Sequence, residues 1–256
     1  MNVDPIISYP PAEFYFSSLP LFILVFGSLV AMLQSVSERW GRCRHVRNTA
    51  YITVIAALMS AIWGAGFWAG SSFLNGSISL SAVGYLSVLL ILIIAVATLL
   101  MANFSTSSTS FFRGEIISLF LAVLVGMVTV LSAGEFITFF VGIEMVSIAI
   151  YALVGYIQPT RKSQEGAVKY LILGSFASGF LLFGLALIYA HTGSMQIGAI
   201  GDIIAQREPS LWLSIGALMF ITGIGFKMAL VPFHMWAPDV YESAPSYFTS
   251  FMATAV

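Results

Sequence analysis

The stretch Leu211 to Pro238, LWLSIGALMFITGIGFKMALVPFHMWAP, places one lysine, Lys227, deep inside a long apolar run. An unpaired cation at bilayer depth costs at least about 2.5 to 3.5 kcal/mol, so this ammonium group needs a compensating partner. Gly223, Gly225 and Pro232 lie around it and predict an interrupted helix, because an interruption turns free carbonyls and helix ends toward polar groups or water. We expect the fold to be organised around this interrupted helix.

The composition predicts an integral membrane protein. Of 256 residues, 59% are hydrophobic and only 8% are charged, and the mean hydropathy is +0.97. The core of a single soluble domain could not bury so many apolar side chains. The single cysteine, Cys43, provides neither a disulfide framework nor a thiolate metal site. The three histidines, His45, His191 and His234, are scattered, so we expect no metal site.

Seven apolar runs are each close to the roughly 20 residues that a membrane-spanning helix needs. They cover residues 15–34, 49–70, 80–102, 115–132, 135–157, 166–190 and 211–235. A further run, 247–256, is too short to cross the hydrocarbon core of roughly 30 Å. We therefore predict an all-α integral membrane protein with seven transmembrane helices, the seventh interrupted, and the start of an eighth, and we expect the sequence to be partial.

The basic residues predict the orientation of these helices. Seven of them follow spans 1, 3 and 5, namely Arg39, Arg42, Arg44, Arg47, Arg113, Arg161 and Lys162. The loops after spans 2, 4 and 6 contain only Arg207. By the positive-inside rule the loops after spans 1, 3, 5 and 7 face the cytoplasm and the N-terminus faces outward. Because topology explains the arginine cluster at 39–47, we expect no nucleic-acid partner.

Three charged residues lie inside the predicted spans. Glu144 is near the middle of FITFFVGIEMVSIAIYALVGY (136–156), with Ser147 one turn away on the same face. Lys169 lies in the first turn of the next span, whose Ser175 and Gly179 predict a small-residue seam for close helix packing.

Each charge has a structural explanation and a functional one. Glu144 and a lysine could form a static packing pair, and Lys169 could extend its stem to the headgroups. Lys227 lies roughly 24 Å along its helix from the outer end, too deep for its side chain to reach the headgroups. Burial disfavours the charged forms of both groups, whereas proximity favours them, so a pair that opens can exchange protons. A chain of such groups linked by water is an ion pathway.

Three blocks of the second half resemble a known family. They are GIEMVSIAIYALVGY at Gly142–Tyr156, AVKYLILGSFASGFLLFGLALIYAHTG at Ala167–Gly193 and GIGFKMALVPFHMWAPDVYESAP at Gly223–Pro245. In this order and spacing they are similar to the antiporter-like subunits shared by NADH:quinone oxidoreductase (respiratory complex I) and multisubunit cation/proton antiporters, and most similar to the subunit N branch. The first hundred residues fit this family only as hydrophobic spans.

The resemblance implies a proton-pumping subunit without a redox centre. It assigns Glu144 to the key glutamate of family helix 5, Lys169 to the lysine of helix 6 and Lys227 to the lysine of the broken helix 7, with His234 in the element that closes that helix. It also implies an N-terminal part of three helices at 1–114 and an antiporter-like unit at 115–256, which would be the first of two inverted repeats.

The resemblance implies partners as well. NADH, FMN, iron–sulfur clusters and quinone would be bound by partner subunits, because this chain has neither the cysteines for a cluster nor a nucleotide-binding fingerprint. Its own partners would be other membrane subunits of complex I, protons and the lipid bilayer of the inner (plasma) membrane. Two alternatives stay open: a subunit of a sodium/proton antiporter complex, and a non-conducting scaffold whose charged residues are structural pairs.

The charge distribution generates a test of topology. Reporter fusions after Arg44, Arg113 and Lys162 should report a cytoplasmic location, and a fusion after Asp202 should report the outside. The measurement is the ratio of activities of a reporter active only in the cytoplasm and one active only outside it. A cytoplasmic signal at Asp202 would invert the predicted orientation.

Overall fold

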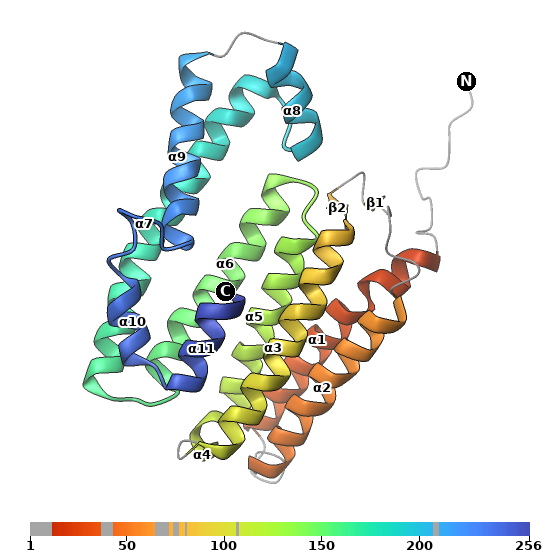
Figure 1. Ribbon diagram of the computed structural model, residues 1–256, viewed down its shortest axis with the longest axis vertical. Helices are drawn as coiled ribbons and strands as arrows, with labels where there is room; N and C mark the ends of the chain where they lie inside the picture. The colour runs from red at the N-terminus through yellow and green to blue at the C-terminus, as the bar shows by residue number, and fades with distance from the viewer. Residues whose placement is uncertain are drawn as a thin grey trace.

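Helices make up most of the computed structural model, which describes residues 12–36, 43–64, 72–73, 77–79, 81–105, 108–206 and 210–256. The long helices run beside one another, and the shorter ones lie at their ends or follow the break after α9 (Figure 1). The helices are α1 (Ala12–Val36), α2 (Cys43–Gly64), α3 (Ala82–Phe104), α4 (Ser108–Phe111), α5 (Gly114–Leu131), α6 (Phe136–Tyr156), α7 (Arg161–Thr192), α8 (Ile197–Gln206), α9 (Leu211–Lys227), α10 (Ala237–Ser243) and α11 (Ser246–Ala255).

Two strands of two residues each, β1 (Ser72–Phe73) and β2 (Ile78–Ser79), pair antiparallel between α2 and α3. Single bridges join Ile78 to Ala133 and Glu135 to Gln196, so the connections at this end of the molecule are tied together. Apart from these short pairings, the predicted all-α class is confirmed for the described residues.

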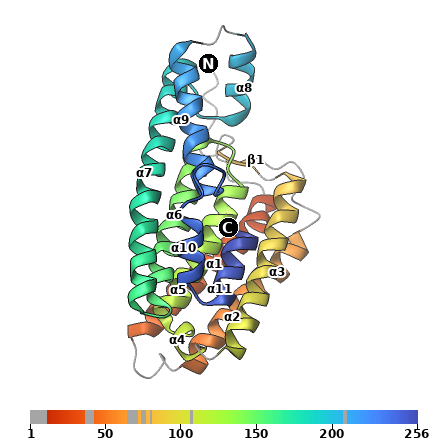
Figure 2. The ribbon, with the colours of Figure 1, turned by 60° about the vertical axis from the view of Figure 1, so that its left-hand side comes forward.

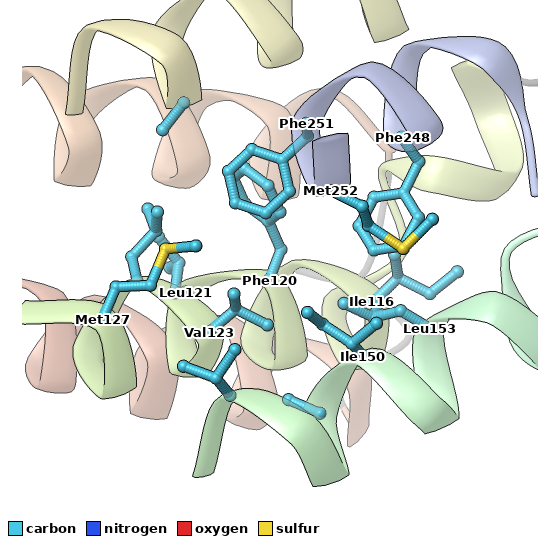
Figure 3. Packing of buried hydrophobic residues seen from close by; sticks show 14 of the residues in the cluster. Ile116, Phe120, Leu121, Val123, Met127, Ile150, Leu153, Phe248, Phe251 and Met252 are labelled. Atoms are coloured by element: carbon cyan, nitrogen blue, oxygen red, sulfur yellow. The ribbon is translucent and has the colours of Figure 1, made fainter. Parts of the chain in front are cut away.

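Helix α5 forms the centre of the hydrophobic core. Its sequence, GEIISLFLAVLVGMVTVL, is apolar on every side, which is typical of a helix surrounded by others, and it packs against α1, α3 and α6. The fully buried rings of Phe120 on α5 and Phe251 on α11 lie with centroids 5.0 Å apart, and Figure 3 shows Phe248 and Met252 beside them. In lipid, such close packing stabilises by van der Waals contact rather than by removal of water.

The number of spans differs from the prediction. Among the described residues, six helices are long and apolar enough to cross a membrane: α1 from Ser18 onward, α2, α3, α5, α6 and α7. The seventh predicted span, 211–235, is not one helix, because α9 has 17 residues and ends at Lys227, and turns follow until α10. The count of seven is therefore not confirmed, whereas the interruption at Lys227 is.

The starts of two helices were also predicted wrongly. Helix α2 begins at Cys43 rather than at residue 49, and residues 65–70 of that predicted span lie outside the described residues. Helix α7 begins at Arg161 rather than at 166, because Thr160 and Ser163 form a capping box there. Hydropathy locates the segment that crosses the hydrocarbon core, but a helix can extend beyond that core into the headgroup region. The polar first turns of α2 and α7 were therefore predicted to be loop residues. Lys169 consequently lies in the third turn of α7, not in the first.

Apart from Lys169 and Lys227, the arginine and lysine residues of the described chain lie at one end of the bundle. The start of α2 with Arg44, the start of α5 after Arg113, and the start of α7 with Arg161 and Lys162 share that end, and α8 lies at the other (Figures 1 and 2). Arg39, Arg42 and Arg207 lie outside the described residues. The helix order thus agrees with the predicted grouping of the loops, and which end faces the cytoplasm stays a prediction.

Helices α7 and α9 approach each other closely at Gly184 and Gly216. A Cβ atom added at Gly184 would lie 2.6 Å from the backbone nitrogen of Phe220, and one at Gly216 would lie 3.0 Å from the backbone oxygen of Gly184. The predicted seam at Ser175 and Gly179 forms no helix contact among the described residues, since both residues are exposed and none of the described atoms lies within 4 Å of a Cβ built at Gly179. The contact face of a nearly uniformly apolar helix is decided by its neighbour.

This contact generates a paired prediction. Gly184→Ala should destabilise the protein by about 1–3 kcal/mol, because the new methyl group meets backbone atoms that cannot rotate away. Gly179→Ala should be neutral or stabilising by up to about 1 kcal/mol, because it gains helix propensity without a clash. Thermal unfolding in detergent measures both, and equal melting temperatures for the two variants would contradict the assigned contact.

Candidate functional site

The ammonium group of Lys227 sits at the broken end of α9. Ala229 has a φ of 50°, in the left-handed region, so a right-handed helix cannot continue through it. The N–H of Leu230 donates to the carbonyl oxygen of Gly225 at 2.8 Å, which satisfies one of the carbonyls freed by the break. Pro232 follows and has no N–H to donate. The break therefore places Lys227 last in its helix.

Gly223 and Gly225 were predicted to interrupt the helix together with Pro232, but α9 continues through both glycines. They serve close packing instead. A Cβ atom at Gly223 would lie 2.7 Å from the Cβ of Leu181 on α7, and one at Gly225 would lie 3.2 Å from the ring of Phe233. The turn after the break thus folds its phenyl ring back onto α9.

Lys227 reaches a row of polar side chains on α6. Its Nζ lies 3.4 Å from Oε1 of Glu144, donates to Oγ of Ser147 at 2.8 Å and lies 3.3 Å from the hydroxyl oxygen of Tyr151. The three α6 residues follow the spacing i, i+3, i+7, which places them on one helix face. The side chains of Lys227 and Glu144 are 11% and 24% exposed, so the pair is largely removed from solvent.

Glu144 has a second partner on α7. Ser178 is buried, and its hydroxyl lies 2.5 Å from Oε1 of Glu144. The carboxylate is therefore held between α7 and the end of α9. Because two ions leave water together only at a large desolvation cost, such additional hydrogen bonds are what make a buried pair tolerable.

A glycine on α7 makes room for the phenol of Tyr151. A Cβ atom at Gly174 would lie 1.9 Å from the Tyr151 hydroxyl oxygen, closer than any real contact. Behind it, the ring of Tyr151 meets that of Tyr170 edge-on with centroids 4.5 Å apart, and Tyr170 stacks on Trp236 at 4.3 Å. The indole N–H of Trp236 donates to the carbonyl oxygen of Phe226 at 3.0 Å. This aromatic row connects the α6 site to the residue before Lys227.

Two cavities border Lys227. One, of about 290 Å³, is also lined by Ser147, Tyr170 and apolar residues of α3, α5 and α6. The other, of about 140 Å³, includes Tyr170, Trp236 and Tyr241. A water molecule occupies about 30 Å³ in the liquid, so both cavities are large enough for several waters beside polar groups.

Lys169 is not brought to this pair. Its side chain is 47% exposed, and its Nζ lies 2.9 Å from Oδ2 of Asp239 and 3.0 Å from Oε1 of Glu165. In the part of the chain that the structure describes, no hydrogen bond or ion pair joins it to Glu144 or Lys227.

His234 lies within the turns after the break and is half-buried. Its Nδ1 atom is buried without a hydrogen-bond partner among the described residues. It too has no hydrogen bond or ion pair with Glu144 or Lys227 within these ranges.

Sequence reasoning missed two members of the site. Tyr151 could have been found, because it lies seven residues after Glu144 on the face that includes Ser147. Ser178 could not, because serines occur throughout α7 and only tertiary packing distinguishes the one that faces Glu144. Ser175 on α7 was selected from the sequence only as part of a packing seam, and its hydroxyl donates to the carbonyl oxygen of Leu171 in its own helix.

The site lies within a segment that matches a family model. Residues 133–256 match the model described as NADH:quinone oxidoreductase/Mrp antiporter, TM. Residues 133–256 belong to that antiporter-like membrane family. The resemblance inferred from the three sequence blocks is thereby confirmed, and the six long apolar helices agree with a multi-pass membrane protein of this family.

Curated relatives extend the match to most of the chain. It is 32% identical over 242 residues to a protein named NADH-quinone oxidoreductase subunit N 2 from Roseiflexus castenholzii, covering 93% of this chain and 48% of that protein. It is 37% identical over 207 residues to subunit N 1 from Thermodesulfovibrio yellowstonii, covering 81% of this chain and 43% of the relative. The chain thus spans about half the length of the curated relatives it matches.

Solved structures share the fold. A chain of respiratory complex I from Thermus thermophilus, solved with bound aureothin, is 29% identical with a TM-score of 0.74, covering 92% of this chain and 50% of that one. A chain of the membrane-bound sulfane sulfur reductase, an archaeal respiratory membrane complex, has a TM-score of 0.79 at 24% identity, covering 95% and 51%. The second likeness concerns the fold alone.

The α7 serines provide a matched test of the site. Ser178→Ala should destabilise the protein by about 1.5–3 kcal/mol, because it removes a hydrogen bond to a charged, largely buried carboxylate. Ser175→Ala removes the same hydroxyl one turn away on the exposed face and should change stability by less than about 0.5 kcal/mol. Thermal unfolding in detergent compares them. Equal stability of the two variants would show that Glu144 does not depend on Ser178.

Proposed function

We propose that this chain is a subunit N-like membrane component of a proton-translocating NADH:quinone oxidoreductase, and that Glu144 and Lys227 exchange protons during translocation. The observation that carries the proposal is the largely buried ion pair between α6 and the broken end of α9. Ionisable groups at membrane depth are expensive, and their default interpretation is an ion or proton pathway.

The geometry of the pair suits a switch. The 3.4 Å separation of Lys227 and Glu144 is long for a charge-assisted hydrogen bond, whose usual length is about 2.7–2.9 Å, whereas Ser147 accepts from the same Nζ at 2.8 Å. A small movement of Lys227 could therefore break the ion pair without removing every partner. Once the pair is open, each of the two groups is free to exchange a proton with another partner.

The surroundings support proton movement on both sides of the pair. The two cavities at Lys227 are large enough for water, and water can link groups that are too far apart for direct transfer. His234, with a buried and unpartnered ring nitrogen among the described residues, is proposed as a further proton-accepting group close to the break. The relay role predicted for Lys169 has no supporting contact, because no hydrogen bond or ion pair in the described part of the chain joins it to Glu144 or Lys227.

The remaining features of the proposal concern the assembly. Redox chemistry with NADH, FMN, iron–sulfur clusters and quinone is assigned to partner subunits, since an iron–sulfur cluster needs about four thiolates and this sequence has one cysteine. We further propose that other membrane subunits surround the chain, that it forms the first inverted-repeat half of the family fold, and that its N-terminus faces outward.

The second candidate function is a subunit of a sodium/proton antiporter complex, because the matching family model names both complexes. The relatives' names favour the oxidoreductase. Neighbouring genes discriminate the two, since each complex has its own companion subunits. A non-conducting scaffold is the third reading, and variants of Lys227 test it.

Lys227→Met and Lys227→Arg should both assemble into the complex and lose most proton pumping, by about tenfold or more, as expected for a lost proton-transfer group. Methionine keeps an unbranched apolar chain without the amine. Arginine keeps the positive charge and can satisfy a static pair, but it does not deprotonate in proteins. The measurement is proton uptake by reconstituted vesicles during NADH oxidation.

The control is NADH oxidation with an artificial acceptor, which should be nearly unchanged in both variants because it does not depend on this chain. Glu144→Ala should reduce pumping in the same way, and Glu144→Asp should be milder. Wild-type pumping by Lys227→Arg would exclude proton loss from Lys227, and normal pumping by Glu144→Ala would favour a scaffold.

A further inference from the structure

An exposed set of charged side chains joins α7 to α10, the short helix that follows the break. We call it the α7–α10 charge cluster. It consists of Lys162, Glu165, Lys169, Asp239 and Glu242. The α7 members follow the spacing i, i+3, i+7, and the α10 members are three residues apart, so each helix presents its charges on one face.

Lys169 is at the centre of this cluster. It binds Asp239 of α10 and Glu165 of its own helix, while Lys162 pairs with Glu242 nearer the start of α7. Lys169 lies eight residues after the start of α7, roughly 12 Å along the helix axis. A helix of 32 residues is roughly 48 Å long and exceeds the hydrocarbon core by roughly 9 Å at each end. This placement puts Lys169 close to the membrane interface, where carboxylates can remain charged beside it.

Tyr170, the next residue of α7, contacts the start of α10 on the buried side of the helix. Tyr170 stacks on Trp236 with an interplanar angle of 8°, and Trp236 donates its indole N–H to the carbonyl oxygen of Phe226. Two consecutive α7 residues therefore contact the start of α10: Lys169 binds Asp239, and Tyr170 stacks on Trp236. Of these contacts, Trp236 is hydrogen-bonded directly to the residue before Lys227.

We propose that Lys169 is a positioning residue. Its ion pair with Asp239 clamps α10 to α7, and the clamp holds the broken end of α9 so that Lys227 stays within reach of Glu144. Lys169 acts through its permanent charge and does not release a proton. This inference rests on the proposed role of the Glu144–Lys227 pair in proton translocation.

The first test compares substitutions of Lys169 in the assembled complex. Lys169→Arg keeps the charge and can bind two carboxylates, so it should retain at least about half of wild-type pumping. Lys169→Met and Asp239→Asn each remove one side of the ion pair and should lose pumping by about threefold or more. Exchanging the charges, with Lys169→Asp and Asp239→Lys in one chain, should restore part of the loss.

The control is Arg161→Met, which removes a positive charge from the same helix. Arg161 forms no salt bridge in the described part of the chain, so this variant should pump normally. A relay predicts the opposite pattern for the main variants: Lys169→Arg would then lose pumping as fully as Lys169→Met. That result would overturn the proposal.

The second test measures the clamp without measuring pumping. Ser243 of α10 is buried against α7. A Cβ atom built at Gly166 of α7 would lie 3.0 Å from the Cβ of Ser243. In a chain carrying Cys43→Ser and Ser243→Cys, the introduced thiol should react slowly with a maleimide reagent. Adding Lys169→Met should accelerate labelling by about threefold or more, because α10 separates from α7 more often, and Lys169→Arg should not.

The two tests fail separately. Unchanged labelling in the presence of Lys169→Met would show that no clamp exists, whatever the pumping result. If labelling changes as expected while Lys227→Met still pumps normally, the clamp is present but the proposed function of the Glu144–Lys227 pair is wrong, and with it the role assigned to Lys169.

Discussion

The structure depends on giving the ammonium group of Lys227 a counter-charge at a depth where water is scarce. Glu144 supplies the charge, and Ser147, Tyr151 and Ser178 supply hydrogen-bonding atoms around it. Three helices must therefore meet at one level: α6 with its polar row, α7 with its buried serine, and the broken end of α9. Removing either ion would leave the other uncompensated, which costs more than the pair itself contributes.

Close backbone packing is what allows these helices to meet. Gly184 and Gly216 let α7 and α9 touch, Gly174 makes space for the phenol of Tyr151, and Gly126 and Gly142 bring α5 and α6 within contact of each other's backbones. Small residues have this role in membranes because lipid offers no hydrophobic driving force between helices, so association relies on contact area and hydrogen bonds. Glycines at the helix contacts thus allow the polar groups of the site to meet.

The break in α9 combines two requirements. It ends the helix at Lys227, so the ammonium group can reach α6, and it returns the chain toward α7 through Trp236 and α10. In a continuous helix Lys227 would lie mid-helix and not at the helix end. The break is positioned from outside by the α7–α10 charge cluster and from inside by the aromatic row, so the conformation of the turn is held by side chains on both sides.

The sequence by itself determined the membrane class, the approximate positions of most long helices, the interruption near Lys227 and the family. Each of these follows from signals that are local in the chain: apolar runs, a proline, a buried charge and motif blocks. Glu144 could be chosen because a carboxylate in an apolar helix is costly wherever that helix packs. The same reasoning gave no partner for Lys169, because its position relative to Asp239 depends on how the chain returns after the break.

Only the tertiary structure decided which faces meet. It moved the close packing from Gly179 to Gly184 and placed the hydroxyl of Ser178 beside Glu144. It also gave Gly223 and Gly225 a packing role inside a continuous α9. An apolar helix has little periodic signal in a membrane, because lipid and protein surroundings accept the same side chains. Its rotation is set by shape and by a few polar contacts with residues far away in sequence, and no local pattern records them.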